Sequence, residues 1–177
     1  AQNRIVMISR KDMLTRLFNR RCFEEELESE ISKSRRYKTH LSIILIDFDN
    51  LKTIINDLGN QTGDNILASS AAVIQSMVRN NDVVCRYGGQ EFGIVLPNTE
   101  LNGARMLAER IRKAIAGHHF DDNRECMSLT VSIGVAAFDR EAGTTFSDFV
   151  KQGFNALTCA LENGGNSVVI STDKKDL

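Results

Sequence analysis

The sequence predicts an α/β (α+β) domain in which helices flank a central β-sheet. Stretches with apolar residues at helical spacing alternate with short runs rich in β-branched residues, which is typical of this class. Two such runs flank a Gly-Gly pair at residues 88–89, as expected for a β-hairpin. The 177 residues, 42% hydrophobic and 25% charged, suffice for one domain with a full core.

The first elements follow from the spacing of apolar residues. A helix is expected from Leu17 to about Tyr37, entered through a turn in which Asp12 or Thr15 is a candidate cap. The continuous apolar run at 41–46 is typical of a strand buried on both faces. The next helix is expected to start near residue 50.

The second half of the chain shows the same patterns. Asp64 is expected to open a helix, and Asn98 or Thr99 to cap a later helix that ends near Ala116. Residues 117–125 are expected to form a polar loop. The remaining elements are predicted as helices at 65–78 and 146–162, and as strands at 83–86, 91–96, 127–137 and 167–170.

The composition limits the classes of function. A formal net charge of −1 argues against a general polyanion-binding surface, so nucleic acid is not expected as a partner. The widely spaced cysteines show no metal-ligand pattern and are interpreted as reduced core residues. They are Cys22, Cys85, Cys126 and Cys159.

The chain contains no predicted membrane or targeting segment. Its longest apolar run is too short to span a bilayer, and the N-terminus lacks the apolar core of a signal peptide. A cytoplasmic domain is therefore expected, which could be the cytosolic part of a membrane sensor. We expect this domain at 11–172, after a connecting segment at 1–10 and before a tail at 173–177.

The hairpin tip carries residues that suggest phosphate chemistry. Gly88 and Gly89 leave the backbone open, so a bulky anion such as a phosphate can approach the amides. Glu91 follows at the tip, where a second carboxylate would help to hold a metal ion. The neighbouring residue is the neutral Gln90, which cannot supply that charge.

The stretch Tyr87-Gly88-Gly89-Gln90-Glu91-Phe92 resembles the signature hairpin of GGDEF domains, the diguanylate cyclases. Asp-Met-Leu-Thr at 12–15 and Thr-Val-Ser-Ile-Gly-Val at 130–135 extend the likeness, although Arg16 replaces a usual glycine. The likeness runs from about residue 12 to residue 169. It implies a central, mostly antiparallel five-stranded sheet flanked by helices.

An acidic pair follows the buried strand. Asp47 and Asp49 share one side of an extended chain at the end of a strand, which makes a Mg²⁺ site plausible. Alternatively, Asp49 caps the next helix and Asp47 satisfies a turn. The resemblance implies that Asp47 and the Phe48 carbonyl hold Mg²⁺ together with the third signature residue, here Gln90. The candidate catalytic residues are Gln90, Glu91 and Asp49.

The resemblance also assigns positions that would bind the substrate. Lys52 matches a lysine directed toward a phosphate, and Asp64 matches an acid that accepts from guanine, unless it only adds charge to a helix N-terminus. Ile55 stands where the family reads guanine with asparagine, a role that Asn56 could take after a one-residue shift. Asn60 replaces a histidine. The substrate-binding candidates are Lys52, Asn56, Asn60, Asp64, Gly88 and Gly89.

Arg79 and Asp82 form an R-x-x-D motif before the hairpin. By default, an arginine in the last turn of a helix pairs with a nearby acid or carbonyl. Five residues separate Asp82 from Gly88, which is the spacing of the family's inhibitory site for cyclic di-GMP, and Arg110 matches a secondary arginine of that site. A guanidinium can bind phosphate or guanine, while a carboxylate accepts from guanine N–H groups.

These features lead to three hypotheses. Leu161 and Gly165 replace a lysine and an arginine that would meet the triphosphate, and Gln90 replaces an acid, which favours a degenerate domain that binds cyclic di-GMP without turnover. The alternatives are an active, Mg²⁺-dependent diguanylate cyclase and a ligand-free dimerisation module. The resemblance implies cyclic di-GMP or GTP as ligand, a homodimer when active or ligand-bound, and an upstream sensor domain.

Overall fold

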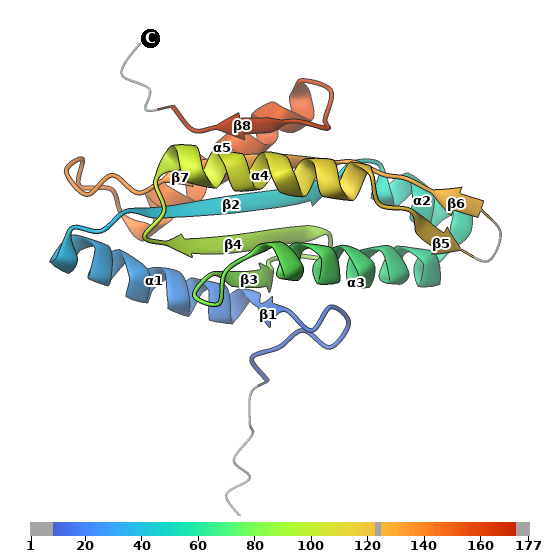
Figure 1. Cartoon of the computed structure of the whole chain (residues 1–177), viewed down its shortest axis with the longest axis horizontal. Coiled ribbons are helices and arrows are strands. Elements are labelled where there is room, and N and C mark those ends of the chain that lie inside the picture. The colour runs from blue at the N-terminus through green and yellow to red at the C-terminus, as the bar shows by residue number, and fades with distance from the viewer. Residues whose placement is uncertain (1–8, 123–124, 173–177) are drawn as a thin grey trace, which may run out of the picture.

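The structure is a computed structural model that describes residues 9–122 and 125–172. Six strands form one mixed sheet in the order β1-β3-β4-β2-β7-β8, shown in Figure 1 from β8 at the top to β1 at the bottom. The three inner pairs are antiparallel, whereas β1–β3 and β7–β8 are parallel. The strands are β1 (Phe18–Asn19), β2 (Leu41–Phe48), β3 (Val83–Arg86), β4 (Glu91–Pro97), β7 (Val131–Ala137) and β8 (Val168–Ile170).

The predicted α/β class is confirmed, with one more strand than expected. The sixth strand, β1, has two residues, which is too short for a residue pattern to reveal. The strand expected at 127–137 is interrupted, because β7 starts at Val131 and the preceding residues form a separate hairpin of β5 (Phe120–Asp122) and β6 (Glu125–Met127). The expected polar loop at 117–125 therefore contains strand residues.

Helices cover both faces of the sheet. They are α1 (Arg20–Tyr37), α2 (Leu51–Leu58), α3 (Asn60–Met77), α4 (Leu101–Ala116) and α5 (Phe146–Glu162). Side chains of β2 alternate between two clusters: Ile44 and Ile46 join the cluster under α3 and α4, while Ile43 and Leu45 join the one under α1 and α5. Burial on both faces explains why this strand reads as a continuous apolar run.

Several helix ends differ from the prediction. Helix α1 begins at Arg20 rather than Leu17, and its cap is Asn19, which accepts from the Cys22 N–H at 2.9 Å. Asp12 instead closes the preceding turn by accepting from the Thr15 amide. In that turn Arg16 adopts φ 63°, the left-handed conformation for which glycine is the usual residue.

Two further caps were predicted wrongly. Helix α3 begins at Asn60, so Asp64 lies beyond its first turn and does not add charge at the N-terminus. Helix α4 has Glu100 at its N-cap, without a side-chain cap bond, so neither Asn98 nor Thr99 caps it. Both errors arise because polar residues near a predicted helix start are common, and only the backbone path selects one of them.

The cysteine prediction holds in part. Cys22 and Cys85 are buried free thiols, but Cys159 is exposed on α5, and the side chain of Cys126 lies outside the described residues. The predicted connecting segment is described only at Ser9 and Arg10, and the tail at 173–177 also lies outside the described residues. Among the described helices, none combines the length and apolar character that crossing a bilayer requires.

Candidate functional site

Two acidic residues face each other where β2 and β4 meet the hairpin tip. Asp47 pairs with Glu91 across the two strands. Burial, and next the Glu91 carboxylate, raise the pKa of Asp47 from 3.8 to about 6. Because two partly buried carboxylates repel each other, this corner of the sheet favours a proton or another positive charge.

The hairpin tip is tightly turned. The amides of Tyr87 and Gly88 both donate to the Glu91 carbonyl, at 2.7 and 3.1 Å. A Cβ at Gly88 would lie 3.0 Å from the Glu91 carboxylate, whereas a Cβ at Gly89 would meet nothing within 4 Å. Gly89 therefore presents the open backbone that the sequence predicted, while the Glu91 side chain folds over Gly88.

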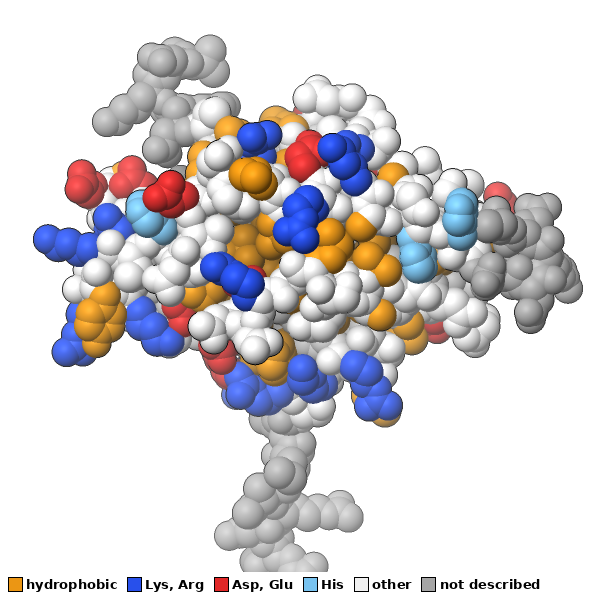
Figure 2. Space-filling model, viewed as in Figure 1, with side chains coloured by type: hydrophobic (Ala, Val, Ile, Leu, Met, Phe, Trp, Pro, Cys, Tyr) orange, Lys and Arg blue, Asp and Glu red, His pale blue; other side chains and the backbone are white. Residues whose placement is uncertain are grey.

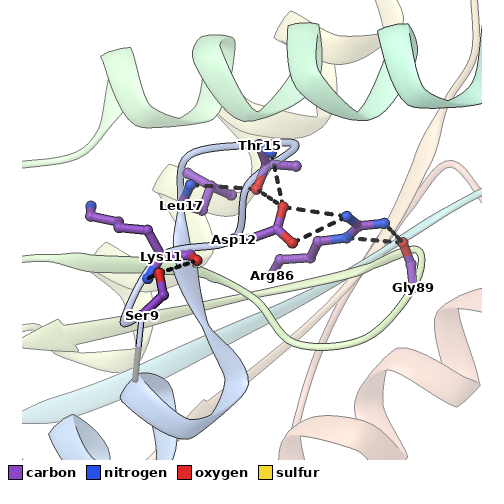
Figure 3. Close-up of polar contacts among 7 residues, drawn as sticks. All are labelled: Ser9, Lys11, Asp12, Thr15, Leu17, Arg86 and Gly89. Carbon is purple, nitrogen blue, oxygen red and sulfur yellow. Dashed lines mark hydrogen bonds and ion pairs between the residues drawn. The ribbon is translucent and has the colours of Figure 1, made fainter. Parts of the chain in front are cut away.

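An arginine that the sequence analysis missed holds this tip (Figure 3). Arg86 donates through Nε and Nη2 to the Gly89 carbonyl, at 3.2 and 2.8 Å, and through Nη1 to the Asp12 carboxylate at 3.3 Å. Asp12 also accepts from the amide and hydroxyl of Thr15. Burial opposes ionisation of Asp12, but these donors and the Arg86 charge outweigh it and lower its pKa. The N-terminal turn is thereby joined to the tip.

Asp49 is held by a set of donors from other segments. Its carboxylate accepts from the hydroxyls of Thr130 and Ser132, at 2.6 and 2.7 Å, and from the backbone N–H of Asn166 at 2.8 Å. The helix cap considered for Asp49 is wrong, because Asn50 occupies the N-cap of α2 and no side chain caps that helix. Asp49 joins the end of β2 to β7 and to the turn after α5.

These residues fit a metal ion poorly. Of the three ligands implied for Mg²⁺, Gln90 supplies a neutral amide, and the carboxylate of nearby Asp49 is already engaged. Within the described ranges, no group of three His, Cys, Asp or Glu side chains gathers in a way that could hold a metal ion. Asp47 and Glu91 are the remaining acids at this corner.

Four of the six expected substrate-binding residues lie on α2 and α3, and the other two are the glycines of the hairpin tip. Lys52, Asn56, Asn60 and Asp64 are all exposed on the two helices. Ile55 packs at the junction of the two helices, where a Cβ at Gly63 would approach it to 2.5 Å. Ile55 is thus part of the packing between helices and presents no polar group to a base.

The turn between α5 and β8 leaves no room for the arginine expected at Gly165. Gly165 has φ 75°, and a Cβ there would lie 2.9 Å from the Asp49 carboxylate. The turn is also fixed from α4, because Arg112 donates to the Asn166 side chain at 2.9 Å. The side chain at Leu161 is partly exposed but uncharged. Both positions therefore lack a cation for a triphosphate.

The structure brings Arg79, Asp82 and Arg110 to one groove of about 520 Å³ between α3, the end of β4 and α4. Arg79 donates to both oxygens of Asp82, at 3.3 and 3.2 Å, so the expected pairing within the motif is present. Figure 2 shows apolar side chains gathered between α3 and α4, with Lys and Arg side chains around them. The groove thus combines apolar walls with two guanidinium groups.

Comparison with known proteins identifies the family. The family model "Diguanylate cyclase, GGDEF domain" matches residues 9–167 of this chain. The chain belongs to the GGDEF family. The chain matches the GGDEF signature at Gly88, Gly89, Glu91 and Phe92 and differs from it at Gln90.

Other GGDEF proteins are similar in sequence. The response regulator PleD of Caulobacter vibrioides is 38% identical over 160 residues, which cover 89% of this chain and 35% of PleD. Diguanylate cyclase DgcP of Pseudomonas aeruginosa is 39% identical over 133 residues, 75% of this chain and 20% of DgcP. The chain therefore spans about a third or less of the length of these two relatives.

Solved GGDEF domains share the fold. The GGDEF domain of DgcB from Caulobacter crescentus, in complex with c-di-GMP, has a TM-score of 0.88 at 26% identity and covers 92% of this chain and 96% of its own. The active GGEEF domain of a diguanylate cyclase from Vibrio cholerae has a TM-score of 0.82 at 32% identity, over 88% of this chain and 98% of its own.

Proposed function

We propose that this GGDEF domain is a receptor for cyclic di-GMP and has lost diguanylate cyclase turnover. The proposal rests on a contrast between the groove that holds the R-x-x-D motif and the expected active site. Arg79, Asp82 and Arg110 line one groove. The positions expected to hold metal and triphosphate are instead occupied by Gln90, Leu161 and Gly165.

The chemistry of the groove suits a cyclic dinucleotide. The guanidinium groups of Arg79 and Arg110 can bind phosphate or the Hoogsteen edge of guanine, and Asp82 can accept from guanine N–H groups. Met77, Met106 and Leu107 line the same groove and offer apolar surface to the bases. Its volume, about 520 Å³, lies within the range of small-molecule sites.

The expected active site, at the opposite end of the sheet from the groove, is poorly suited to binding GTP. Loss of the two cations at Leu161 and Gly165 removes two charge-assisted contacts, each on the order of 1.5–3 kcal/mol. Binding of GTP should then be weaker by roughly 10²- to 10⁴-fold than in a domain that has both cations. An arginine at Gly165 would also be strained, since φ there is 75° and its Cβ would crowd the Asp49 carboxylate.

One observation favours a second candidate, a weak diguanylate cyclase. Asp47 and Glu91 lie side by side, and the raised pKa of Asp47 indicates a corner that would accept a cation. Such an enzyme would hold the metal ion with these two acids, without the carboxylate that Gln90 replaces. Lys52 would contact a phosphate of GTP. Incubation with GTP and either Mg²⁺ or Mn²⁺ tests it directly, because formation of cyclic di-GMP would overturn the loss of turnover.

The context of the domain is also part of the proposal. We infer an upstream sensor domain, a homodimer when ligand is bound, and a cytoplasmic location. Similarity to PleD, which is much longer than this chain, supports the inference of further domains. Light scattering with and without cyclic di-GMP tests the dimer, and a mass that does not change would contradict it.

Calorimetry with cyclic di-GMP, GTP and GDP tests the receptor proposal. We expect micromolar or tighter binding of cyclic di-GMP that Arg79→Ala abolishes and Arg110→Ala weakens. Arg105→Ala is the matched control, since Arg105 lies on the same helix as Arg110 but donates to Asn102 and is not among the residues that line the groove. Unchanged binding in Arg79→Ala would refute the site, and no binding of any nucleotide would favour the ligand-free module.

A further inference from the structure

The two charged residues of the R-x-x-D motif pair with each other, and this pairing is called the closed position of Arg79. Only 1% of the Asp82 side chain is exposed, and both of its oxygens accept from Arg79. The Arg79 backbone amide adds a third contact to Asp82, at 2.9 Å. A ligand therefore cannot donate to Asp82 while the Arg79 side chain lies over it, although 62% of that side chain is exposed.

A residue outside the motif holds Arg79 in this closed position. The Nη2 atom of Arg79 donates to the Thr99 hydroxyl at 2.6 Å, which is shorter than its contacts with Asp82 and with the Pro97 carbonyl, both 3.2 Å. Thr99 in turn donates to the Pro97 carbonyl at 3.0 Å. Its position follows from Asn98, whose φ of 51° turns the chain at the end of β4.

We propose that Thr99 is a positioning residue that keeps Arg79 closed on Asp82 and thereby sets the affinity of the groove for cyclic di-GMP. This inference rests on the proposed function of the groove. A ligand must exchange the Thr99 contact of Arg79 for its own phosphate or guanine oxygen. The apparent affinity is reduced by the small fraction of molecules in which Arg79 is open.

Removal of the Thr99 hydroxyl should raise that fraction. A hydrogen bond to a charged group is among the stronger ones in proteins, but water can replace it at this exposed side chain. We therefore expect Thr99→Val to bind cyclic di-GMP about 3- to 10-fold more tightly. Loss of a purely structural threonine would weaken binding or leave it unchanged, so the sign of the effect is diagnostic.

Calorimetry with cyclic di-GMP on the whole chain tests the inference. Thr99→Ser keeps the hydroxyl and should restore wild-type affinity, and Thr99→Ala should repeat the gain if the valine variant folds poorly. In an Arg79→Ala background, where binding is expected to be lost, Thr99→Val should not restore it, because the hydroxyl acts through Arg79. Tighter binding that serine reverses supports the inference, whereas equal or weaker binding in Thr99→Val overturns it.

A second measurement separates this inference from the function on which it rests. The ¹⁵N relaxation of the Arg79 Nε–H group in the ligand-free domain reports how firmly the side chain is held. We expect greater mobility in Thr99→Val than in the wild type and in Thr99→Ser. Unchanged mobility overturns the role of Thr99. If mobility rises but cyclic di-GMP binds to none of the proteins, the proposed function fails with the effect on affinity, and only the holding of Arg79 by Thr99 stands.

Discussion

Asp47→Asn and Asp49→Asn should change the stability of the domain in opposite directions, although the two aspartates are separated by one residue. Both substitutions replace a carboxylate by an amide of nearly the same shape, so they test charge more than packing. The difference arises because Asp47 faces the Glu91 carboxylate, whereas Asp49 faces three donors.

Asp47 is expected to be destabilising in its charged form. Its pKa is raised from 3.8 to about 6, so between these values the folded state holds a proton that the unfolded chain has released. Stability from this group is therefore lost as the pH rises through that window. The full shift corresponds to about 3 kcal/mol, which partial solvation reduces, so we expect Asp47→Asn to stabilise the domain by about 1–2 kcal/mol at pH 7.

Asp49 is expected to be stabilising. An asparagine at this position keeps one acceptor oxygen for three donors, and it loses the negative charge that strengthens each bond. The Ser132 hydroxyl is fully buried and cannot turn to water. We therefore expect Asp49→Asn to destabilise the domain by about 2–3 kcal/mol.

Urea unfolding of the wild type and both variants, from pH 4 to pH 7.5, measures both effects. The gain of Asp47→Asn over the wild type should be absent near pH 4 and complete above pH 6.5, while the loss in Asp49→Asn should be present at pH 7. A stability of Asp47→Asn at pH 7 below that of the wild type would refute the repulsion with Glu91. A neutral Asp49→Asn would refute the role of its donors.

Three further predictions concern the fold and the hairpin. Gly134→Ala should unfold the domain or destabilise it by about 3 kcal/mol or more, because its Cβ would clash with the backbone of Gly153 and Leu157 in α5. Gly89→Ala, whose Cβ would meet nothing within 4 Å, should be neutral by thermal unfolding. Arg86→Met should speed amide exchange at the hairpin tip, since the Gly89 carbonyl and Asp12 lose their shared donor; unchanged exchange would contradict this. Asn19→Ala should lower the free energy of unfolding by about 1 kcal/mol through loss of the α1 cap, and Asn19→Asp should preserve it.

Local patterns predicted most of the fold. Periodicity located α1, α3, α4 and α5, and the Gly-Gly turn located the hairpin, because both depend on residues near one another in sequence. For α2 only the start, near residue 50, was predicted. The two-residue β1 and the caps of α1, α3 and α4 were missed. Each depends on where a segment meets the rest of the chain rather than on its own residues.

The candidate site was predictable as a list of positions but not as an arrangement. The end of the buried strand selected Asp47 and Asp49, and the hairpin tip selected Glu91, but the sequence did not show which partners each of them has. Arg86 was not selected at all, because a single arginine before a turn carries no distinctive pattern. Its importance becomes visible only when its contacts with the tip and the N-terminal turn are known.

By itself, the sequence determined the family, the class of fold and the loss of charge at Gln90, Leu161 and Gly165. The tertiary structure decided what the remaining charges do. Asp49 meets a donor 117 residues away in the chain, and Arg79 meets the Thr99 hydroxyl 20 residues away. Whether a charged group is free to bind a ligand depends on the partners that folding brings to it, and such distant partners leave no mark in local sequence patterns.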